Sequence, residues 1–255
     1  MQEFLSGGLE IAFIDVAAEG SDVGEPILLI HGFASSHRIN WVDPQWVSTL
    51  TKSGRRVIAL DNRGHGKSEK PHDPNAYRLE TMARDAANLL DHLAIARADV
   101  MGYSMGARIS CFLAVNNPGR VRAMILGGLG AHLTENGGPP IRIAEAMEAP
   151  SLESLTDPMQ RMFRSFAEQN KSDLIALAAC MRGSRQNLTR AEIAGIACPV
   201  FVAVGTRDEI AGDPRRLAQM FPNGEALDIP GRDHNRAVGD KVFKAAVLEF
   251  LKRRR

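Results

Sequence analysis

Several features that would indicate a membrane, secreted or nucleic-acid-binding protein are missing from this sequence. No apolar run approaches the ~20 residues with which a helix crosses a bilayer, and no basic-then-apolar signal segment opens the chain. The net charge is +1, which favours neither nucleic acid nor an anionic membrane as a partner. The three cysteines are odd in number and set among apolar residues, as is typical of reduced core positions. We therefore expect a soluble, cytoplasmic protein with no membrane or nucleic-acid partner.

Signatures of nucleotide cofactors and of metal sites are missing as well. The segment ending at Ser68 has Asp61 where a phosphate-binding loop needs its first glycine. The pair Gly128 and Gly130 is followed by Leu133 where a dinucleotide fingerprint needs its third glycine. The histidines form no His-x-x-x-His pair and join no cysteine cluster. The chemistry is therefore expected to come from the chain's own side chains, without cofactor or metal.

What the chain does contain is an alternation of strand and helix patterns. Its 255 residues suit one large domain, and 44% of them are hydrophobic, which is enough for a substantial core. Apolar runs such as Ile27 to Ile30 predict buried parallel strands, and the stripe from Leu79 to Leu93 predicts a helix that covers one face of a sheet. The fold class predicted is α/β, with a mostly parallel, doubly wound sheet built from residues 1–130 and 194–255.

The alternation stops between residues 131 and 193, where helical patterns occur without a convincing strand. The start of this segment, Asn136 to Pro140, is loop-like, and further prolines separate short helices. These helices carry more apolar surface than they can bury among themselves, so we predict an inserted helical cap on the core. An apolar substrate pocket is expected to be lined by Trp41 of the core and by four cap residues, Met147, Met162, Phe163 and Phe166.

A candidate nucleophile lies at residues 102–106, which read Gly-Tyr-Ser-Met-Gly and follow a short apolar strand directly before a predicted helix. A serine on so sharp a turn has a strained backbone, and the two glycines leave room for the strand and helix beside it. Ser104 is therefore predicted to stand exposed at the carboxyl end of the sheet. The amide of Met105 would point to where a carbonyl oxygen becomes negative.

Two further strands end beside residues that complement a serine. Asp208 follows a buried strand of the second core segment, and His234 follows the last predicted strand. Because the carboxyl ends of parallel strands share one edge of the sheet, the three side chains are expected to meet. His234 would be the base for Ser104, and Asp208 would orient the imidazole. Glu209 and Asp213 remain alternatives to Asp208.

Together these motifs resemble the α/β-hydrolase superfamily over nearly the whole chain. The resemblance is carried by five features in the chain order of that family, which are His31-Gly32, the turn from Asp61 to Ser68, the Ser104 elbow, Asp208 and His234. It implies a Ser-His-Asp enzyme without metal or organic cofactor. One departure is Asp233, which stands where many relatives have a small residue before the histidine.

The resemblance also implies a role for the loop that follows the strand Ile27 to Ile30. A fold of this kind draws its second oxyanion donor from that loop, so the amide of Phe33 is the expected partner of the Met105 amide. His31, in the same loop, is expected to hold the turn by hydrogen bonds rather than to act as a base.

The activity implied is hydrolysis of a carboxylic ester or thioester of a small, partly apolar substrate through an acyl-enzyme. A carbon-carbon bond hydrolase or an enol-lactonase would use the same three residues, so both remain alternatives. A ligand receptor of the same fold, without hydrolytic turnover, is an alternative from another class. The partner is a small molecule in each case, and neither its identity nor the oligomeric state follows from the sequence.

Overall fold

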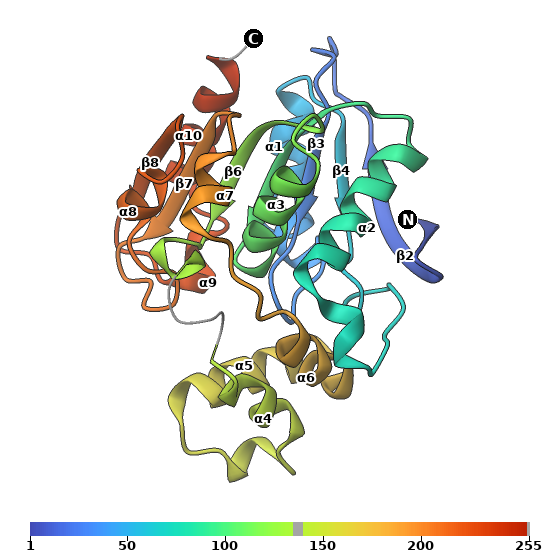
Figure 1. Cartoon of the computed structure of the whole chain (residues 1–255), viewed down its shortest axis with the longest axis vertical. Helices are drawn as coiled ribbons and strands as arrows, with labels where there is room; N and C mark the ends of the chain where they lie inside the picture. Colours follow the sequence, from blue (N-terminus) through green and yellow to red (C-terminus); the bar gives the residue numbers. More distant parts are fainter. Residues whose placement is uncertain (135–139, 254–255) are drawn as a thin grey trace.

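The computed structural model describes residues 1–134 and 140–253, and in them one sheet of eight strands forms the centre of the molecule (Figure 1). The strand order is β1-β2-β4-β3-β5-β6-β7-β8. The pairs β1–β2 and β2–β4 are antiparallel and all the others are parallel. The strands are β1 (Gln2–Ser6), β2 (Leu9–Val16), β3 (Ile27–Ile30), β4 (Val57–Leu60), β5 (Ala98–Tyr103), β6 (Val121–Gly127), β7 (Val200–Gly205) and β8 (Gly224–Ile229). The predicted mostly parallel, doubly wound α/β fold is confirmed.

Helices cover both faces of this sheet. In chain order the helical segments of the described ranges are η1 (Arg38–Val42), α1 (Trp46–Lys52), η2 (Pro74–Tyr77), α2 (Leu79–His92), α3 (Met105–Asn116), η3 (Ala131–Leu133), α4 (Arg142–Glu148), η4 (Leu152–Ser154), α5 (Pro158–Gln169), α6 (Leu174–Gly183), α7 (Arg190–Ala194), α8 (Pro214–Ala218), α9 (His234–Ala237) and α10 (Lys241–Lys252). Among them, no helix is long and apolar enough to cross a membrane.

Successive side chains of the central strands pack against opposite helix layers. Leu28 and Ile30 of β3 belong to the core shared with α2 and α3, whereas Ile27 and Leu29 belong to the core shared with α1 and α10. Figure 1 shows α2 and α3 on the face of the sheet nearer the viewer and α1 and α10 behind it. Both faces are therefore buried, which explains why these strands are apolar along their whole length.

The described part of the segment between β6 and β7 is helical and contains no strand. Helices α4, α5 and α6 lie beyond one end of the sheet, at the bottom of Figure 1, while α7 packs against α3 of the core. Residues 135–139, within the loop-like start of the predicted cap, lie outside the described residues.

Helices α5 and α6 begin at capping aspartates, because Asp157 and Asp173 accept hydrogen bonds from their first-turn amides.

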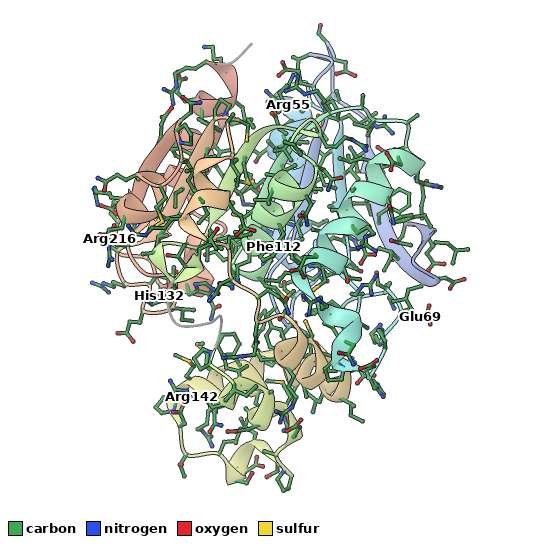
Figure 2. All side chains as sticks on the ribbon, in the orientation of Figure 1. Arg55, Glu69, Phe112, His132, Arg142 and Arg216 are labelled. Atoms are coloured by element: carbon green, nitrogen blue, oxygen red, sulfur yellow. The ribbon has the colours of Figure 1, made fainter. Side chains whose placement is uncertain are left out.

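A buried ion-pair cluster occupies the opposite end of the sheet. Arg55, labelled at the top of Figure 2, donates from Nη1 to Asp99 at 2.6 Å, and Arg122 of β6 donates from Nη2 to the same carboxylate at 3.0 Å. The side chains of Arg55 and Asp99 are 1% and 0% exposed, and Arg55 also pairs with Glu25 at 3.0 Å, so each of these two buried charges has two partners of opposite sign. These contacts join the amino ends of the strands, which leaves the carboxyl ends to carry other groups.

The start of α3 lies very close to the sheet. A Cβ at Gly106 would lie 1.9 Å from the carbonyl oxygen of Ile30, and one at Gly102 would lie 2.3 Å from the carbonyl oxygen of Gly106. Real side chains do not tolerate such distances, so only glycine fits at either position. The first turn of α3 therefore lies directly against β3, with nothing between the two backbones.

This contact predicts the effect of adding one methyl group. Gly106→Ala should lower the free energy of unfolding by about 3 kcal/mol, because two backbone segments must separate to admit the Cβ. Gly119→Ala is the matched control, since a Cβ at Gly119 meets no atom within 4 Å, and its effect should stay within about 0.5 kcal/mol. Urea denaturation followed by circular dichroism measures both variants. Equal unfolding midpoints for the two would contradict the close contact.

Candidate active site

Ser104 joins β5 to α3 in a strained conformation. Its φ of 54° and ψ of −114° lie in a region that residues other than glycine seldom adopt. The strain persists because Gly102 and Gly106 hold β5 and α3 against their neighbours on either side of the turn. Ser104 remains partly exposed while the residues around it are buried. The predicted elbow is thus present as a backbone feature, and its serine stands at the carboxyl end of β5.

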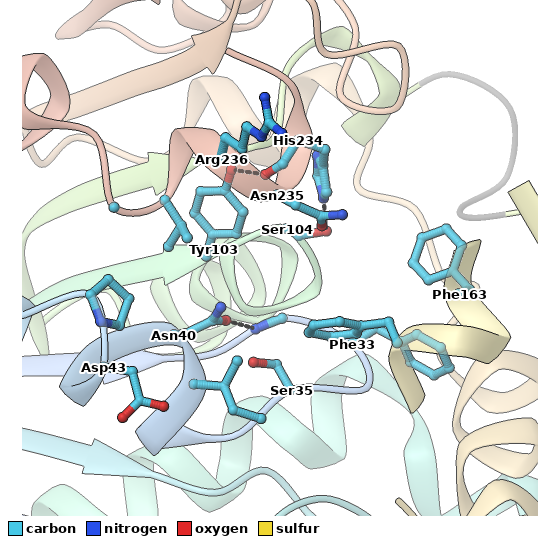
Figure 3. A pocket seen from close by; sticks show the side chains of 16 residues that line it. Phe33, Ser35, Asn40, Asp43, Tyr103, Ser104, Phe163, His234, Asn235 and Arg236 are labelled. Atoms are coloured by element: carbon cyan, nitrogen blue, oxygen red, sulfur yellow. Dashed lines mark hydrogen bonds between the residues drawn. The ribbon is translucent and has the colours of Figure 1, made fainter. Parts of the chain in front are cut away.

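Three side chains from distant parts of the chain meet at this edge of the sheet. His234 Nε2 lies 3.0 Å from Ser104 Oγ, and His234 Nδ1 lies 2.7 Å from Asp208 Oδ2 (Figure 3 shows the contact between His234 and Ser104). An ionised carboxylate only accepts hydrogen bonds, so Nδ1 carries the proton and Nε2 presents its lone pair to the serine hydroxyl. The arrangement can move a proton from Ser104 to His234.

Asp208 is held in place from its other side. Its Oδ1 accepts hydrogen bonds from the amides of Ile210 and Ala211 at 2.8 and 3.0 Å, and its side chain is fully buried. The alternatives do not reach the histidine. Glu209 is exposed, and the Asp213 carboxylate caps α8 by accepting from two amides of its first turn. Of the three carboxylates considered from the sequence, Asp208 is the one in contact with His234.

Asp233 caps a helix instead of contacting the imidazole. Its Oδ1 accepts from the amides of Asn235 and Arg236, which begin α9. The residue that departs from the pattern of many relatives therefore fixes the start of the short helix that carries His234. Asx capping of this kind is common before helices, so the sequence signal was there to be read.

Tyr103 is a site residue that sequence reasoning missed. It is buried beneath His234, with ring centroids 5.6 Å apart, and its hydroxyl donates to the His234 carbonyl oxygen at 2.5 Å (Figure 3). Gly127 and Gly128 make room for it, because a Cβ at either would lie under 3 Å from the Tyr103 ring. Tyr103 thus ties β5 to the segment that carries the imidazole. The variable position of an elbow motif contains no signal for such a role.

The turn after β3 is held by His31. Its Nδ1 donates to the Gly32 carbonyl oxygen at 2.7 Å, and its Nε2 accepts from the Asn62 amide at 2.9 Å. The ring is fully buried and burial lowers its pKa to about 4, so the imidazole stays neutral at physiological pH. The expectation that His31 holds the loop by hydrogen bonds is confirmed.

Two backbone amides beside Ser104 have no hydrogen-bond partner among the described residues. The Gly32 amide donates to Asn40 Oδ1 at 2.7 Å (Figure 3). By contrast, neither the Phe33 amide nor the Met105 amide donates to another residue within the described ranges. Both residues line a cavity together with Ser104. Amides left without acceptors next to a nucleophile are suited to an oxygen that becomes negative during reaction.

Two cavities open on either side of Ser104. One, of about 380 Å³, has a mixed wall in which Ser35 and Asn40 are polar and Ile39 is apolar, and the other, of about 410 Å³, lies under α4 and α5. Phe33 and Phe163 line both cavities, and their rings meet edge to face with centroids 6.0 Å apart. This aromatic pair, one member from the core and one from α5, therefore lies between the two spaces.

The predicted pocket residues divide into two groups. Phe163 and Phe166 line the first cavity, and Met162 lines a third space of about 450 Å³ that His234 also borders. Trp41 and Met147 line none of these three cavities and both side chains are buried, so the structure contradicts these two predictions. Trp41 is fully buried against Trp46 in the core shared with α1 and α10. Met147 is 3% exposed and lies on α4, which packs against α5 and α6.

Comparison with known proteins agrees with this fold. A family model described as "alpha/beta hydrolase fold" matches residues 25–177. The 2-hydroxy-6-oxo-2,4-heptadienoate hydrolase of Pseudomonas putida is 35% identical over 124 residues, which are 49% of this chain and 42% of that protein. The chain is thus similar to less than half of that relative.

Solved structures resemble the chain over nearly its whole length. The enol-lactonase from Burkholderia xenovorans LB400 superposes with a TM-score of 0.78 at 24% identity, covering 98% of this chain and 100% of that one. The bromoperoxidase from Bacillus anthracis superposes with a TM-score of 0.76 at 22% identity, covering 96% of each chain. At these identities the likeness establishes the fold.

A second buried histidine lies beside His31. His65 donates from Nδ1 to the Arg63 carbonyl oxygen, its Nε2 is buried without a hydrogen-bond partner among the described residues, and burial lowers its pKa to about 3. Its ring centroid lies 5.3 Å from that of His31. Neither imidazole can therefore become charged without disturbing the turns after β3 and β4.

These two histidines predict how stability depends on pH. Between pH 6.5 and about 4 the unfolded chain binds a proton at each histidine that the folded chain does not, so lowering the pH favours unfolding. The folding equilibrium constant should fall by about tenfold per pH unit for each of them. His65→Asn should halve the logarithmic slope, because it removes one of the two buried imidazoles. Urea midpoints at pH 5 to 6.5 measure the slope, and an unaltered slope in His65→Asn would rule out this account.

Proposed function

Because the chain belongs to the alpha/beta-hydrolase family, we propose that it is a serine hydrolase that cleaves a carboxylic ester or thioester of a small, partly apolar molecule through an acyl-enzyme. The observation that carries the proposal is the hydrogen-bonded series from Ser104 through His234 to Asp208, next to two backbone amides that have no acceptor among the described residues. We place the reaction in the cytoplasm and assign it no cofactor. Residues 131–193 would serve as a cap, because Phe163 and Phe166 of α5 line the cavity that reaches Ser104.

The first half of the reaction makes the acyl-enzyme. Ser104 Oγ attacks the substrate carbonyl carbon while His234 Nε2 takes the hydroxyl proton. Asp208 holds the Nδ1–H tautomer and stabilises the imidazolium that forms. The carbonyl oxygen becomes negative between the Phe33 and Met105 amides, each such donor being worth about 3 kcal/mol of barrier. His234 then gives the proton to the leaving group as the carbon–oxygen or carbon–sulfur bond breaks.

The second half of the reaction releases the acid. A water molecule takes the place of the leaving group, and His234 Nε2 accepts one of its protons while the hydroxide adds to the acyl carbon. The same two amides hold the oxyanion again, and the proton on His234 returns to Ser104 as the ester bond to the enzyme breaks. The enzyme ends with the protonation states in which it began, so no co-reactant other than water is needed.

A second candidate activity is cleavage of a carbon-carbon bond or of an enol-lactone with the same residues. It is favoured by the similarity to a 2-hydroxy-6-oxo-2,4-heptadienoate hydrolase and to an enol-lactonase. These reactions also pass through an oxyanion on a carbonyl next to the serine, so the geometry above serves each of them. Turnover of the respective substrates distinguishes them from simple ester hydrolysis.

The role of Ser104 is tested with a graded set of p-nitrophenyl acyl esters and a fluorophosphonate that labels activated serines. Ser104→Ala should lower kcat by four to six orders of magnitude, roughly the range found for nucleophiles of such triads, and should abolish labelling. Ser110 lies on the same helix and donates a hydrogen bond to the Gly106 carbonyl oxygen, so Ser110→Ala should keep both ester turnover and labelling. No labelling of the folded wild type would overturn the proposal and favour a ligand receptor of this fold.

The role of Asp208 is tested by Asp208→Asn. The amides of Ile210 and Ala211 would keep the asparagine oxygen on their side, so its NH2 group would face His234 Nδ1. The imidazole would then carry its proton on Nε2 and could not accept one from Ser104. We expect kcat to fall by about 10⁴ with little change in unfolding free energy.

The matched control is Asp213→Asn, because asparagine also caps helices and Asp213 lies outside the hydrogen-bonded series. Its kcat should equal that of the wild type. Ester hydrolysis and urea denaturation are measured for both variants. Activity of Asp208→Asn within tenfold of the wild type would remove Asp208 from the mechanism.

A further inference from the structure

Arg108 differs from the other buried arginines in having no carboxylate partner. Arg55 pairs with Asp99, Arg63 with Asp85 and Arg164 with Glu168, each with an N–O distance of 2.6 or 2.7 Å. Arg108 is 4% exposed, yet no carboxylate lies within ion-pair distance of it in the described ranges. It stands one helical turn after Ser104, on α3.

The hydrogen bonds of Arg108 leave its charge uncompensated. The guanidinium donates to the carbonyl oxygens of His132 and Gln186 at 3.3 and 2.8 Å, and to Asn187 Oδ1 at 3.1 Å. All three acceptors are neutral, and the buried Nε–H has no partner among the described residues. Burial lowers the pKa of Arg108 to about 10, so the group is still cationic at pH 7. A buried cation in neutral surroundings is costly unless an anion joins it.

Arg108 lines the cavity under α4 and α5, together with Ser104 and Met105. Figure 2 labels two further lining residues, His132 on η3 and Arg142 on α4. Much of the remaining wall is apolar and consists of Phe33, Leu129, Ile143, Met159, Phe163, Ile210 and Ala211. Glu209 is the one carboxylate among the described residues of the wall, and it is exposed. The buried part of the cavity therefore combines a cation and apolar side chains next to the nucleophile.

We propose that this cavity is a subsite for an anionic group, in which the Arg108 guanidinium binds a carboxylate of the substrate. The proposal rests on the hydrolase function proposed above. It narrows the substrate to an ester or thioester that carries a second, free carboxylate a few bonds from the scissile carbonyl. A monoester of a short dicarboxylic acid meets this description, as does an ester whose leaving group bears the carboxylate. Arg108 is a specificity-determining residue and takes no part in the bond-breaking steps.

The first test needs only the wild-type enzyme and two matched pairs of esters. Mono-p-nitrophenyl glutarate, which carries a carboxylate on its acyl side, is compared with the uncharged p-nitrophenyl pentanoate. 4-Carboxyphenyl butanoate is compared with 4-(methoxycarbonyl)phenyl butanoate, which places it on the leaving group. A charge-assisted hydrogen bond predicts a kcat/KM higher by about ten- to a hundredfold for the charged member of one pair. Equal or lower values for the charged member of both pairs would overturn the subsite.

The second test uses Arg108→Gln and Arg108→Lys with the preferred pair. Loss of a merely structural contact would lower turnover of both esters alike, whereas loss of anion binding changes their ratio. The ratio of kcat/KM values should fall to about one in Arg108→Gln and to an intermediate value in Arg108→Lys, which keeps a charge. Arg84→Gln removes an exposed charge from α2 and should leave the ratio unchanged. An unchanged ratio in folded Arg108→Gln would also overturn the proposal.

A binding measurement separates failure of the subsite from failure of the hydrolase. Glutarate and glutaramide are titrated calorimetrically into the wild type and Arg108→Gln. Glutarate should bind the wild type alone, and glutaramide should bind neither protein. Glutarate binding without any ester turnover would support the subsite and reject the hydrolase. Ester turnover without glutarate binding and without a charge preference would support the hydrolase and reject the subsite.

Discussion

The direct contact between α3 and β3 is the constraint on which the rest of the site depends. With no room for a side chain at Gly106, the first turn of α3 lies against the Ile30 carbonyl, and the chain must turn sharply at Ser104 to reach it. The strain at Ser104 is held by the packing of two buried elements. This one contact between helix and sheet therefore fixes the positions of the serine hydroxyl, the Met105 amide and Arg108 in the first turn of α3.

Residues whose role is backbone geometry could be predicted from the sequence, and residues whose role is a side-chain contact mostly could not. The elbow is marked by glycines, and the meeting of Ser104, Asp208 and His234 follows from the shared edge of parallel strands. Trp41 was misplaced because η1 has only five residues, which is too short to show a periodicity that reveals which way a side chain faces. Strand β1 was missed because most of its side chains are exposed, so it lacks an apolar pattern.

Tyr103 and Arg108 show a further limit of sequence reasoning. Each lies in a buried element where a polar residue is read simply as part of a strand or a helix. The hydrogen bond from Tyr103 to His234 joins positions 131 residues apart. Arg108 differs from the other buried arginines because no carboxylate of the described residues lies within ion-pair distance of it. Such features become visible only when the surroundings of a side chain are known in three dimensions.

The Phe33–Phe163 pair has a consequence for the order of events after bond cleavage. Because both rings border the two cavities that meet at Ser104, the two fragments of a cleaved ester would occupy separate chambers. Departure of the leaving group would empty one cavity, while the acyl group would stay attached to Ser104 in the other cavity, across the two rings. Water could then approach the acyl carbon through the vacated chamber without displacing the bound half. In the proposed reaction, this arrangement would favour hydrolysis of the acyl-enzyme over its reaction with the leaving group.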